Sequence, residues 1–279
     1  MKKPFILTNY LKYLQTASLL IFFNFSISSQ ISISKNSEVN NIKPFDFVEI
    51  DNQGYLYLVH DDQILKLNKD GIELYRYSNK TLGEIAELDV SNSLRPIVFY
   101  KNQAIIVLLD NTLSQQEDII NLSALNLDQA NCIANSNFDN GIWFYDIALN
   151  EIIKLNSKSQ FQLKSGNLSA ILTNVSLPII AMEENNGNLY AQTSNEILVF
   201  DQYGSLIHNL NISTNSKPIF TENSILYTEN NFLNTYEILD FQSSKTKMEF
   251  SYDYIRGGKT ILVGILDDHI DLLELKINN

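Results

Sequence analysis

A short strand–turn–strand pattern recurs along this chain. Its clearest copy is DNQGYLYLVHDDQILKLNKDG at residues 51–71, in which the apolar runs Tyr55–Leu58 and Ile64–Leu67 lie between turn residues. Similar copies begin at Gly141 (GIWFY, then EIIKL) and at Gly187 (GNLY, then EILVF), and weaker copies follow the same plan. A strand pair of this kind cannot bury both of its faces alone, so several of them must pack against one another.

The spacing of the copies predicts the architecture. Six turn positions are taken as equivalent: Gly54, Gln103, Gly141, Gly187, Asn223 and Lys259. Their spacings of 49, 38, 46, 36 and 36 residues fit the period of roughly 40–50 residues that is typical of β-propeller blades. We therefore predict an all-β fold, a β-propeller of six four-stranded blades. Two packed sheets, or a seventh blade within residues 115–130, are the alternatives.

The two ends of the chain are expected to share the last blade. The final copy contains only three apolar runs, Met248–Tyr254, Thr260–Leu266 and Ile270–Ile277, whereas Gln30–Ser34 alternates like a strand. We predict that this N-terminal strand closes the last blade and covers an open sheet edge. Proline lacks the N–H that a sheet interior needs, so Pro44, Pro96, Pro178 and Pro218 are expected to begin the innermost strands of blades 1, 2, 4 and 5.

Residues 1–29 resemble a secretory signal peptide. Two lysines follow Met1, the apolar run Ala17–Phe25 comes next, and small serines precede Gln30. The apolar run is too short for an ordinary membrane span, although an uncleaved anchor is the alternative. We therefore expect a single propeller domain over residues 30–279 that is periplasmic and associated with the outer membrane, without membrane insertion.

The charge of the chain excludes one class of partner. Residues 1–29 hold three of the 20 Lys and Arg residues and none of the 32 Asp and Glu residues, so residues 30–279 carry a formal charge of −15. A chain this acidic does not bind nucleic acid through the phosphate backbone. The single cysteine, Cys132, rules out an internal disulfide and is expected to be a small core residue.

No residue pattern in the sequence indicates catalysis. The three histidines have no metal-ligand spacing, no serine lies in a G-x-S-x-G motif, and the Asp61–Asp62 pair is interpreted as turn chemistry. We therefore predict no catalytic, cofactor-binding or metal-binding residue and no enzyme. The alternative is a Ca²⁺-dependent, lactonase-like hydrolase with its site at the central channel. The acidic residues that first strands would bring there are Asp46, Glu49, Asp51, Glu87 and Asp89.

Protein binding is the predicted function, and one tract is the candidate surface. Leu82–Leu113 is the least repeat-like segment. It contains a polar turn at Asp89–Ser93 and a second one, Asp110-Asn111-Thr112, directly after a very apolar run. The candidate partner-binding residues are Asp89, Asn92, Leu94, Arg95, Asp110 and Asn111. The aromatic run Trp143-Phe144-Tyr145 is interpreted as blade packing, with a partner interface as the alternative.

The same tract carries a resemblance. DVSNSLRPIVFY, followed by LLDNTLS, is similar to a family of exported propeller-like proteins of Bacteroidota. This resemblance implies a role as the plug subunit of the type 9 secretion translocon, with an outer-membrane β-barrel protein as the partner and no catalytic residues. The chain also resembles six-bladed propellers with NHL- or YWTD-like repeats, although it lacks the YWTD motif itself.

Overall fold

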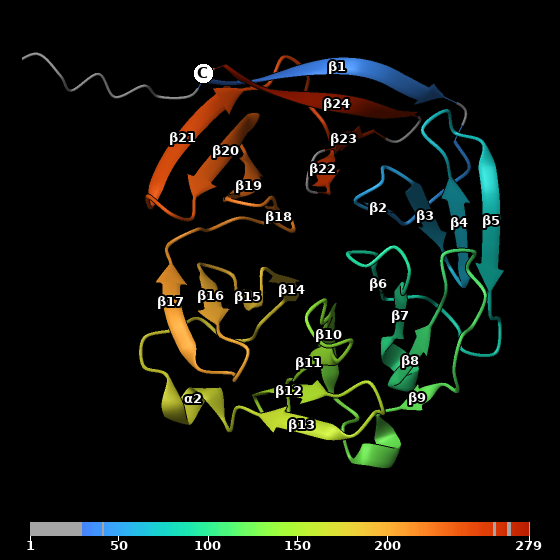
Figure 1. Ribbon diagram of the computed structural model, residues 1–279, viewed down its shortest axis with the longest axis vertical. Coiled ribbons are helices and arrows are strands. Elements are labelled where there is room, and N and C mark those ends of the chain that lie inside the picture. The colour runs from blue at the N-terminus through green and yellow to red at the C-terminus, as the bar shows by residue number, and fades with distance from the viewer. Residues whose placement is uncertain (1–29, 41, 259–260, 267–268, 279) are drawn as a thin grey trace, which may run out of the picture. The chain divides into compact units, whose positions relative to one another are not determined.

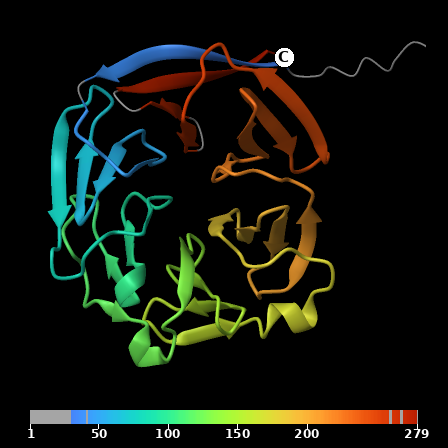
Figure 2. The same cartoon turned by 180° about the vertical axis from the view of Figure 1, so that it is seen from behind.

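The computed structural model describes residues 30–40, 42–258, 261–266 and 269–278. Two compact units are distinguished: Ile33–Leu275, and Met1–Ser32 together with Lys276–Asn279. The larger unit is a ring of six four-stranded antiparallel sheets (Figures 1 and 2). The predicted six-bladed β-propeller is therefore confirmed, and two packed sheets are excluded. The expected signal peptide lies outside the described residues.

Each blade is a meander whose strands run from the central axis outward. Blade 1 contains β2 (Phe47–Ile50), β3 (Leu56–His60), β4 (Gln63–Leu67) and β5 (Glu73–Ser78). Blade 2 contains β6 (Glu87–Asp89), β7 (Ile97–Tyr100), β8 (Ile105–Leu108) and β9 (Ile120–Asn121). Blade 3 contains β10 (Ala130–Asn135), β11 (Ile142–Asp146), β12 (Glu151–Leu155) and β13 (Phe161–Lys164).

The second half of the ring repeats this order. Blade 4 contains β14 (Ala181–Asn185), β15 (Asn188–Gln192), β16 (Ile197–Phe200) and β17 (Leu206–Leu210). Blade 5 contains β18 (Ile219–Phe220), β19 (Ser224–Glu229), β20 (Phe232–Glu237) and β21 (Gln242–Lys247). Blade 6 contains β22 (Tyr254–Gly257), β23 (Leu262–Ile265), β24 (His269–Asn278) and β1 (Gln30–Asn40).

The last blade is closed as the sequence predicts. The N-terminal strand β1 lies beside β24 as the outer strand of blade 6 (Figure 1), and it extends beyond the predicted Gln30–Ser34. The prediction of a strand over Met248–Tyr254 is wrong, because β22 begins only at Tyr254. Residues 249–253 are mostly exposed and have few apolar side chains to hold them in a sheet.

Helices are minimal in the described residues. One α-helix, α2 (Leu168–Ile171), and two short 3₁₀ turns, η1 (Lys101–Gln103) and η2 (Ser123–Leu125), lie in connections. No helix among them is long and apolar enough to cross a membrane. The alternative of a seventh blade within residues 115–130 is excluded, because this segment supplies β9 and η2.

Blade 2 is where the predicted register is wrong. Gln103 lies in η1, between β7 and β8, whereas the other described anchors precede the second strand of their blades. Pro96 accordingly begins β7, the second strand, and not the innermost strand. The true innermost strand is β6, whose sequence Glu-Leu-Asp has no apolar alternation beyond Leu88.

The core consists of six apolar clusters, one between each pair of neighbouring blades. Strand β11 shows how the sequence builds them, since alternate side chains of a strand point to opposite faces. Ile142 and Phe144 pack toward blade 2, whereas Trp143 and Tyr145 pack toward blade 4. Cys132 is buried in the same layer as Trp143. The predictions that the aromatic run and Cys132 belong to the core are confirmed.

Two buried lysines occupy the same position in blades 1 and 3. Lys66 of QILKL pairs across the sheet with Tyr57, and Lys154 of EIIKL pairs with Trp143. Each ammonium group lies over its aromatic partner, at 5.0 Å from the Tyr57 ring centroid and 4.6 Å from that of Trp143. Lys154 also forms an ion pair with Asp139 at 2.8 Å. The cation–π contacts and polar partners stabilise these charges inside the packing between blades.

The ring has two faces that differ in their loops. On one face lie the turns between first and second strands and between third and fourth strands, and we call it the pocket face. Hydrogen bonds join neighbouring turns there: Asn52 Nδ2 donates to the Ser91 carbonyl (3.1 Å), and Asn137 Nδ2 donates to Ser91 Oγ (3.2 Å). The other turns form the opposite face.

Candidate functional site

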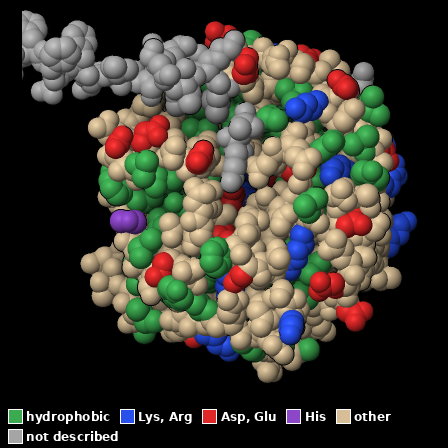
Figure 3. Space-filling model, viewed as in Figure 1, with side chains coloured by type: hydrophobic (Ala, Val, Ile, Leu, Met, Phe, Trp, Pro, Cys, Tyr) green, Lys and Arg blue, Asp and Glu red, His purple; other side chains and the backbone are tan. Residues whose placement is uncertain are grey.

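A polar pocket lies at the centre of the pocket face, where the innermost strands end. Its volume is about 140 Å³, enough for roughly five water molecules at about 30 Å³ each. Four blades contribute charged side chains to its wall: Glu49, Asp89, Glu183, Glu184 and Lys217. In the view of Figure 3, acidic side chains lie near the centre of the ring, with hydrophobic side chains distributed around them.

Glu49 is balanced by the two cations of the channel. Its Oε1 lies 3.6 Å from Lys217 Nζ and 3.5 Å from Arg256 Nε. The Arg256 guanidinium also lies over the Tyr254 ring, 4.7 Å from the centroid. Glu49 is thus the carboxylate within ion-pair distance of both cations, although Lys217 also interacts electrostatically with Glu183, Glu87 and Asp89.

Asp89 and Glu87 fasten β6 to the next blade. Asp89 is buried, and its Oδ2 accepts a hydrogen bond from the Asn135 backbone N–H at 2.7 Å. Glu87 Oε2 accepts one from the Ile133 N–H at 3.0 Å. Both carboxylates therefore accept hydrogen bonds from backbone N–H groups of β10 and join blade 2 to blade 3. These bonds explain why a strand this polar lies next to the axis.

Glu183 is the carboxylate without a fixed partner. Among the described residues its side chain makes no hydrogen bond or ion pair, although it lies in the pocket wall. Burial, together with the neighbouring carboxylates Asp89 and Glu49, raises the pKa of Glu183 to about 8 against the opposing effect of Lys217. Burial likewise raises the pKa of Glu87 to about 7. These two carboxyl groups therefore hold their protons to a higher pH than ordinary surface carboxyl groups do.

These raised pKa values predict how stability depends on pH. A carboxyl group whose pKa is higher in the folded than in the unfolded chain binds more protons when folded. Its stabilising effect is full below the ordinary value of 4.5 and is lost as the pH rises to about 8 for Glu183. We expect the free energy of unfolding to fall across this window, by at most about 1.4 kcal/mol per pH unit for each group.

Urea unfolding of the wild type and of Glu183→Gln at pH 5 to 9 measures this contribution. The wild type should lose more stability than the variant between pH 5 and pH 8. Equal slopes for the two proteins would contradict the raised pKa of Glu183.

The candidate partner-binding residues fall into two groups on the pocket face. Asp89 lines the pocket, and the β6–β7 loop that follows it carries Asn92, Leu94 and Arg95. Asn92 Oδ1 accepts a hydrogen bond from the Leu94 N–H at 3.1 Å, and Arg95 Nη1 donates to Asn135 Oδ1 at 2.9 Å. Leu94 itself is 64% exposed. The loop is thus held in place and presents one apolar side chain to solvent.

Asp110 and Asn111 lie apart from the pocket, in the segment after β8. Asp110 Oδ1 accepts hydrogen bonds from the hydroxyl and N–H of Thr112, and these contacts lower its pKa. The Asn111 carbonyl accepts a hydrogen bond from Lys66 Nζ at 2.9 Å. The capped turn expected from the sequence is present, and its polar groups serve the contact between blades 1 and 2.

Three of the five acidic residues expected near the channel are there. Glu49, Glu87 and Asp89 interact electrostatically within the channel. Asp51 instead accepts a hydrogen bond from the Tyr57 hydroxyl at 3.0 Å between blades, and Asp46 lies exposed at the opposite face. The expectation is therefore wrong for Asp46 and Asp51, because they lie just before and just after strand β2.

The pocket face also carries most of the strongly exposed apolar side chains. Seven large hydrophobic side chains of the described residues are more than half exposed, and six of them lie in turns of this face. The six are Ile72, Leu94, Phe138, Tyr203, Leu239 and Phe241. Leu94 and Phe138 lie on loops joined by the Ser91–Asn137 hydrogen bond, and both loops line the pocket.

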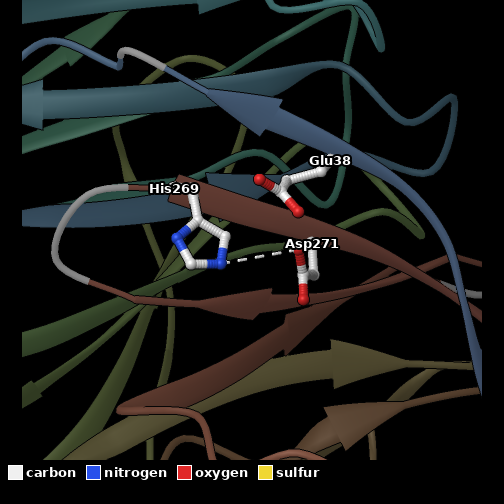
Figure 4. Close-up of side chains that lie close together, drawn as sticks. All are labelled: Glu38, His269 and Asp271. Carbon is white, nitrogen blue, oxygen red and sulfur yellow. Dashed lines mark ion pairs between the residues drawn. The ribbon is translucent and has the colours of Figure 1, made fainter.

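Two clusters elsewhere have metal-binding residue types within the part of the chain that is described. In the first, Glu38, His269 and Asp271 converge between β1 and β24 (Figure 4). Lys35 Nζ lies 2.7 Å from Asp271 Oδ1 and pairs with Glu38 as well, so an ammonium group already offsets part of the charge of these two carboxylates. The cluster is an ion-pair network that fastens the closing strand.

The second cluster belongs to an exposed turn. Asp46 Oδ2 accepts a hydrogen bond from the Asp61 N–H at 2.7 Å, and His60 Nδ1 lies 3.3 Å from Asp46 Oδ1. Asp61 has a positive φ of 50°, which agrees with its interpretation as a turn residue. Neither cluster lines the pocket, and the carboxylates of the pocket do not form such a group among the described residues.

Comparisons with known proteins show the fold and no closer relationship. No protein-family model matches the sequence, and no curated protein matches it either. A streptogramin B lyase structure is similar over 88% of this chain and 98% of that one, with a TM-score of 0.58 and 13% identity. A chain of the mitotic checkpoint complex (TM-score 0.59, 9% identity) covers 91% and 94%, and BamB from Moraxella catarrhalis (0.51, 10%) covers 89% and 94%. At these identities the likeness shows a shared β-propeller fold, which hosts enzymes and binding proteins alike.

Proposed function

We propose that this chain is a non-enzymatic, protein-binding propeller that docks a partner on its pocket face. The observation that carries the proposal is the unequal distribution of exposed apolar side chains, six of seven of which lie in turns of that face. Apolar side chains in a polar surround are typical of protein interfaces. The similar chain from the mitotic checkpoint complex, a propeller-like chain within a complex, supports the same function.

The finer proposal concerns place and partner. The signal-like residues 1–29 and the acidic composition fit a periplasmic protein that is associated with the outer membrane. Its partner would then be a β-barrel protein of an export complex, for which the type 9 secretion translocon is the candidate implied by the sequence resemblance. The propeller would contribute a rigid docking disc and no chemistry.

Capture from detergent-solubilised cell envelope tests this function. The full chain with a C-terminal affinity tag is compared with the double variant Leu94→Ser/Phe138→Ser. Burying either side chain is worth about 1.5–3 kcal/mol, so the double variant should retain at least about tenfold less partner. Ile147→Ser is the matched control, since Ile147 is 43% exposed in the β11–β12 turn of the opposite face.

Each outcome of the capture experiment has a definite meaning. A stoichiometric outer-membrane β-barrel protein that the double variant loses and the control retains supports the whole proposal. A partner that all three proteins capture equally contradicts docking through the pocket face. Mass spectrometry of the captured protein identifies or excludes the translocon.

A Ca²⁺-dependent hydrolase is the second candidate. The observation that favours it is the presence of Glu49, Asp89 and Glu183 around one pocket, since carboxylate oxygens are the ligands that Ca²⁺ prefers. Elemental analysis of the purified chain distinguishes the two functions. One equivalent of calcium that Glu183→Gln abolishes would favour the hydrolase, whereas a metal-free chain that captures its partner would not.

A further inference from the structure

We propose that the central pocket recognises a lysine or arginine side chain of the docked partner, with Glu183 as the carboxylate that pairs with it. This inference rests on the proposed function, because it names the chemistry of the partner segment that the pocket face receives. Three features of the pocket carry it: the charge of its wall, its size and its apolar rim.

Acidic side chains outnumber basic ones in the wall of the pocket. Glu49, Asp89, Glu183 and Glu184 line the pocket, against Lys217 as the one cation among its described lining residues. Lys217 lies 3.6 Å from Glu49, and Asp89 is used by backbone N–H groups of blade 3 and of its own turn. Glu184 is engaged as well, by Ser136 Oγ and Trp143 Nε1, each at 2.7 Å.

The remaining carboxylate is therefore Glu183. It lies in the wall without a hydrogen bond or ion pair among the described residues. Burial raises the pKa of its carboxyl to about 8, because the nearby Lys217 ammonium, which forms no direct ion pair with it, only partly offsets the cost of burying the charge. A guanidinium or ammonium group would supply that compensation and displace the proton.

The size of the pocket fits one long side chain. A volume of about 140 Å³ holds the four-carbon stem and ammonium of lysine, or an arginine, but not a folded segment. Long basic side chains bury their aliphatic stems while the charged end finds a polar partner. Val90 and Phe220 also line the pocket and offer apolar contacts to such a stem.

The exposed side chains at the rim of the pocket, Leu94 and Phe138, predict which residues flank the basic residue in the partner. Leu94 and Phe138 are 64% and 67% exposed, and their loops supply Ser91 and Asn137 to the pocket wall. A partner segment whose basic side chain enters the pocket would place its neighbouring residues on these two side chains. We therefore expect a basic residue flanked by apolar ones.

Selection from a randomised heptapeptide display library, with the tagged full chain as bait, tests the inference without knowledge of the partner. The wild type should enrich lysine or arginine beside apolar residues, Glu183→Gln should lose the basic enrichment, and Glu84→Gln should keep it. Glu84 is the matched control because it is exposed in the β5–β6 connection at the other end of β6. Enrichment of acidic residues, of apolar residues alone or of nothing would overturn the proposal.

Calorimetry with an enriched peptide gives a readout that a merely structural role of Glu183 would not move. Glu183→Gln should weaken binding at least about tenfold and abolish proton release, which the wild type shows as a binding heat that depends on the buffer. Wild-type affinity should rise from pH 6.5 to pH 8.5, because the proton on Glu183 competes with the incoming cation. Circular dichroism confirms that the variant is folded. Unchanged affinity in Glu183→Gln would refute the assignment.

The capture experiment distinguishes an error in the pocket assignment from an error in the proposed function. If Glu183→Gln captures the envelope partner as well as the wild type does, while Leu94→Ser/Phe138→Ser does not, docking stands and the pocket assignment falls. If the double variant also captures the partner, docking through this face falls as well.

Discussion

Deletion of β1, residues 30–40, is expected to abolish the single cooperative unfolding transition of the propeller. Without β1 the edge of β24 is open, and the buried Val39 leaves the cluster between blades 6 and 1. Asp271, which is 2% exposed, loses the Lys35 ammonium and keeps the Tyr252 hydroxyl at 3.1 Å and His269 Nε2 at 3.8 Å. Because Lys35 is exposed, the larger part of the expected loss comes from the open β24 edge and from the missing Val39 side chain.

Thermal unfolding followed by circular dichroism measures this effect. Lys35→Met keeps the strand but removes the cation, so it should lower the melting temperature less than the deletion does. Lys43→Met is the matched control, because Lys43 pairs with Glu73 on the exposed surface, where such a pair contributes at most about 1 kcal/mol. A deletion variant that melts at the wild-type temperature would show that β1 does not close the ring.

Trp143→Ala is expected to destabilise the chain by about 3–5 kcal/mol. Trp143 is fully buried between blades 3 and 4, and its Nε1 donates to Glu184 Oε2 at 2.7 Å. Its ring also covers the buried Lys154 ammonium. The substitution therefore leaves a cavity and also removes a donor and a cation–π partner from two buried charges.

Urea unfolding of two further variants separates these contributions. Trp143→Phe fills most of the space but lacks the N–H donor, so we expect a loss of about 1–3 kcal/mol from the unsatisfied carboxylate. Phe161→Ala is the control for removing an aromatic ring, since Phe161 is 43% exposed on the outer strand β13, and it should cost under about 1 kcal/mol. If Trp143→Ala costs no more than this control, the account of the blade 3–4 contact is wrong.

The sequence predicted the ring because second and third strands carry the pattern of buried strands. Their apolar runs, such as Tyr55–Leu58 and Ile64–Leu67, face packed blades on both sides. First strands give weaker sequence signals, since each of them is the edge strand that borders the polar channel. In blade 2 the strand β6 is only Glu-Leu-Asp, so the next apolar run, Ile97–Tyr100, gives the stronger signal of a first strand. The error follows from the position of β6 beside a polar channel.

The candidate site could be predicted only in part. Asp89 and Leu94 stand out because they follow each other in one polar turn of the sequence. Glu183 and Lys217 come from blades 4 and 5 and meet Asp89 only through closure of the ring, which no sequence spacing encodes. Phe138 lies in the turn segment NFDNG, where composition indicates a loop but does not reveal the exposure of a ring. Acidic residues on first strands, such as Glu49, Asp89 and Glu183, are the signal that points to such a pocket.

The composite sixth blade dictates the order in which the chain can fold. Blades 1 to 5 each use one continuous stretch of chain, so each can form as soon as its four strands have left the ribosome. Blade 6 pairs the first described strand with the last, and the entropy lost on joining such distant segments is repaid only at that step. Ring closure is therefore the final folding event. Until it happens, every copy in which β24 has formed presents an unpaired β24 edge, the kind of edge at which chains aggregate.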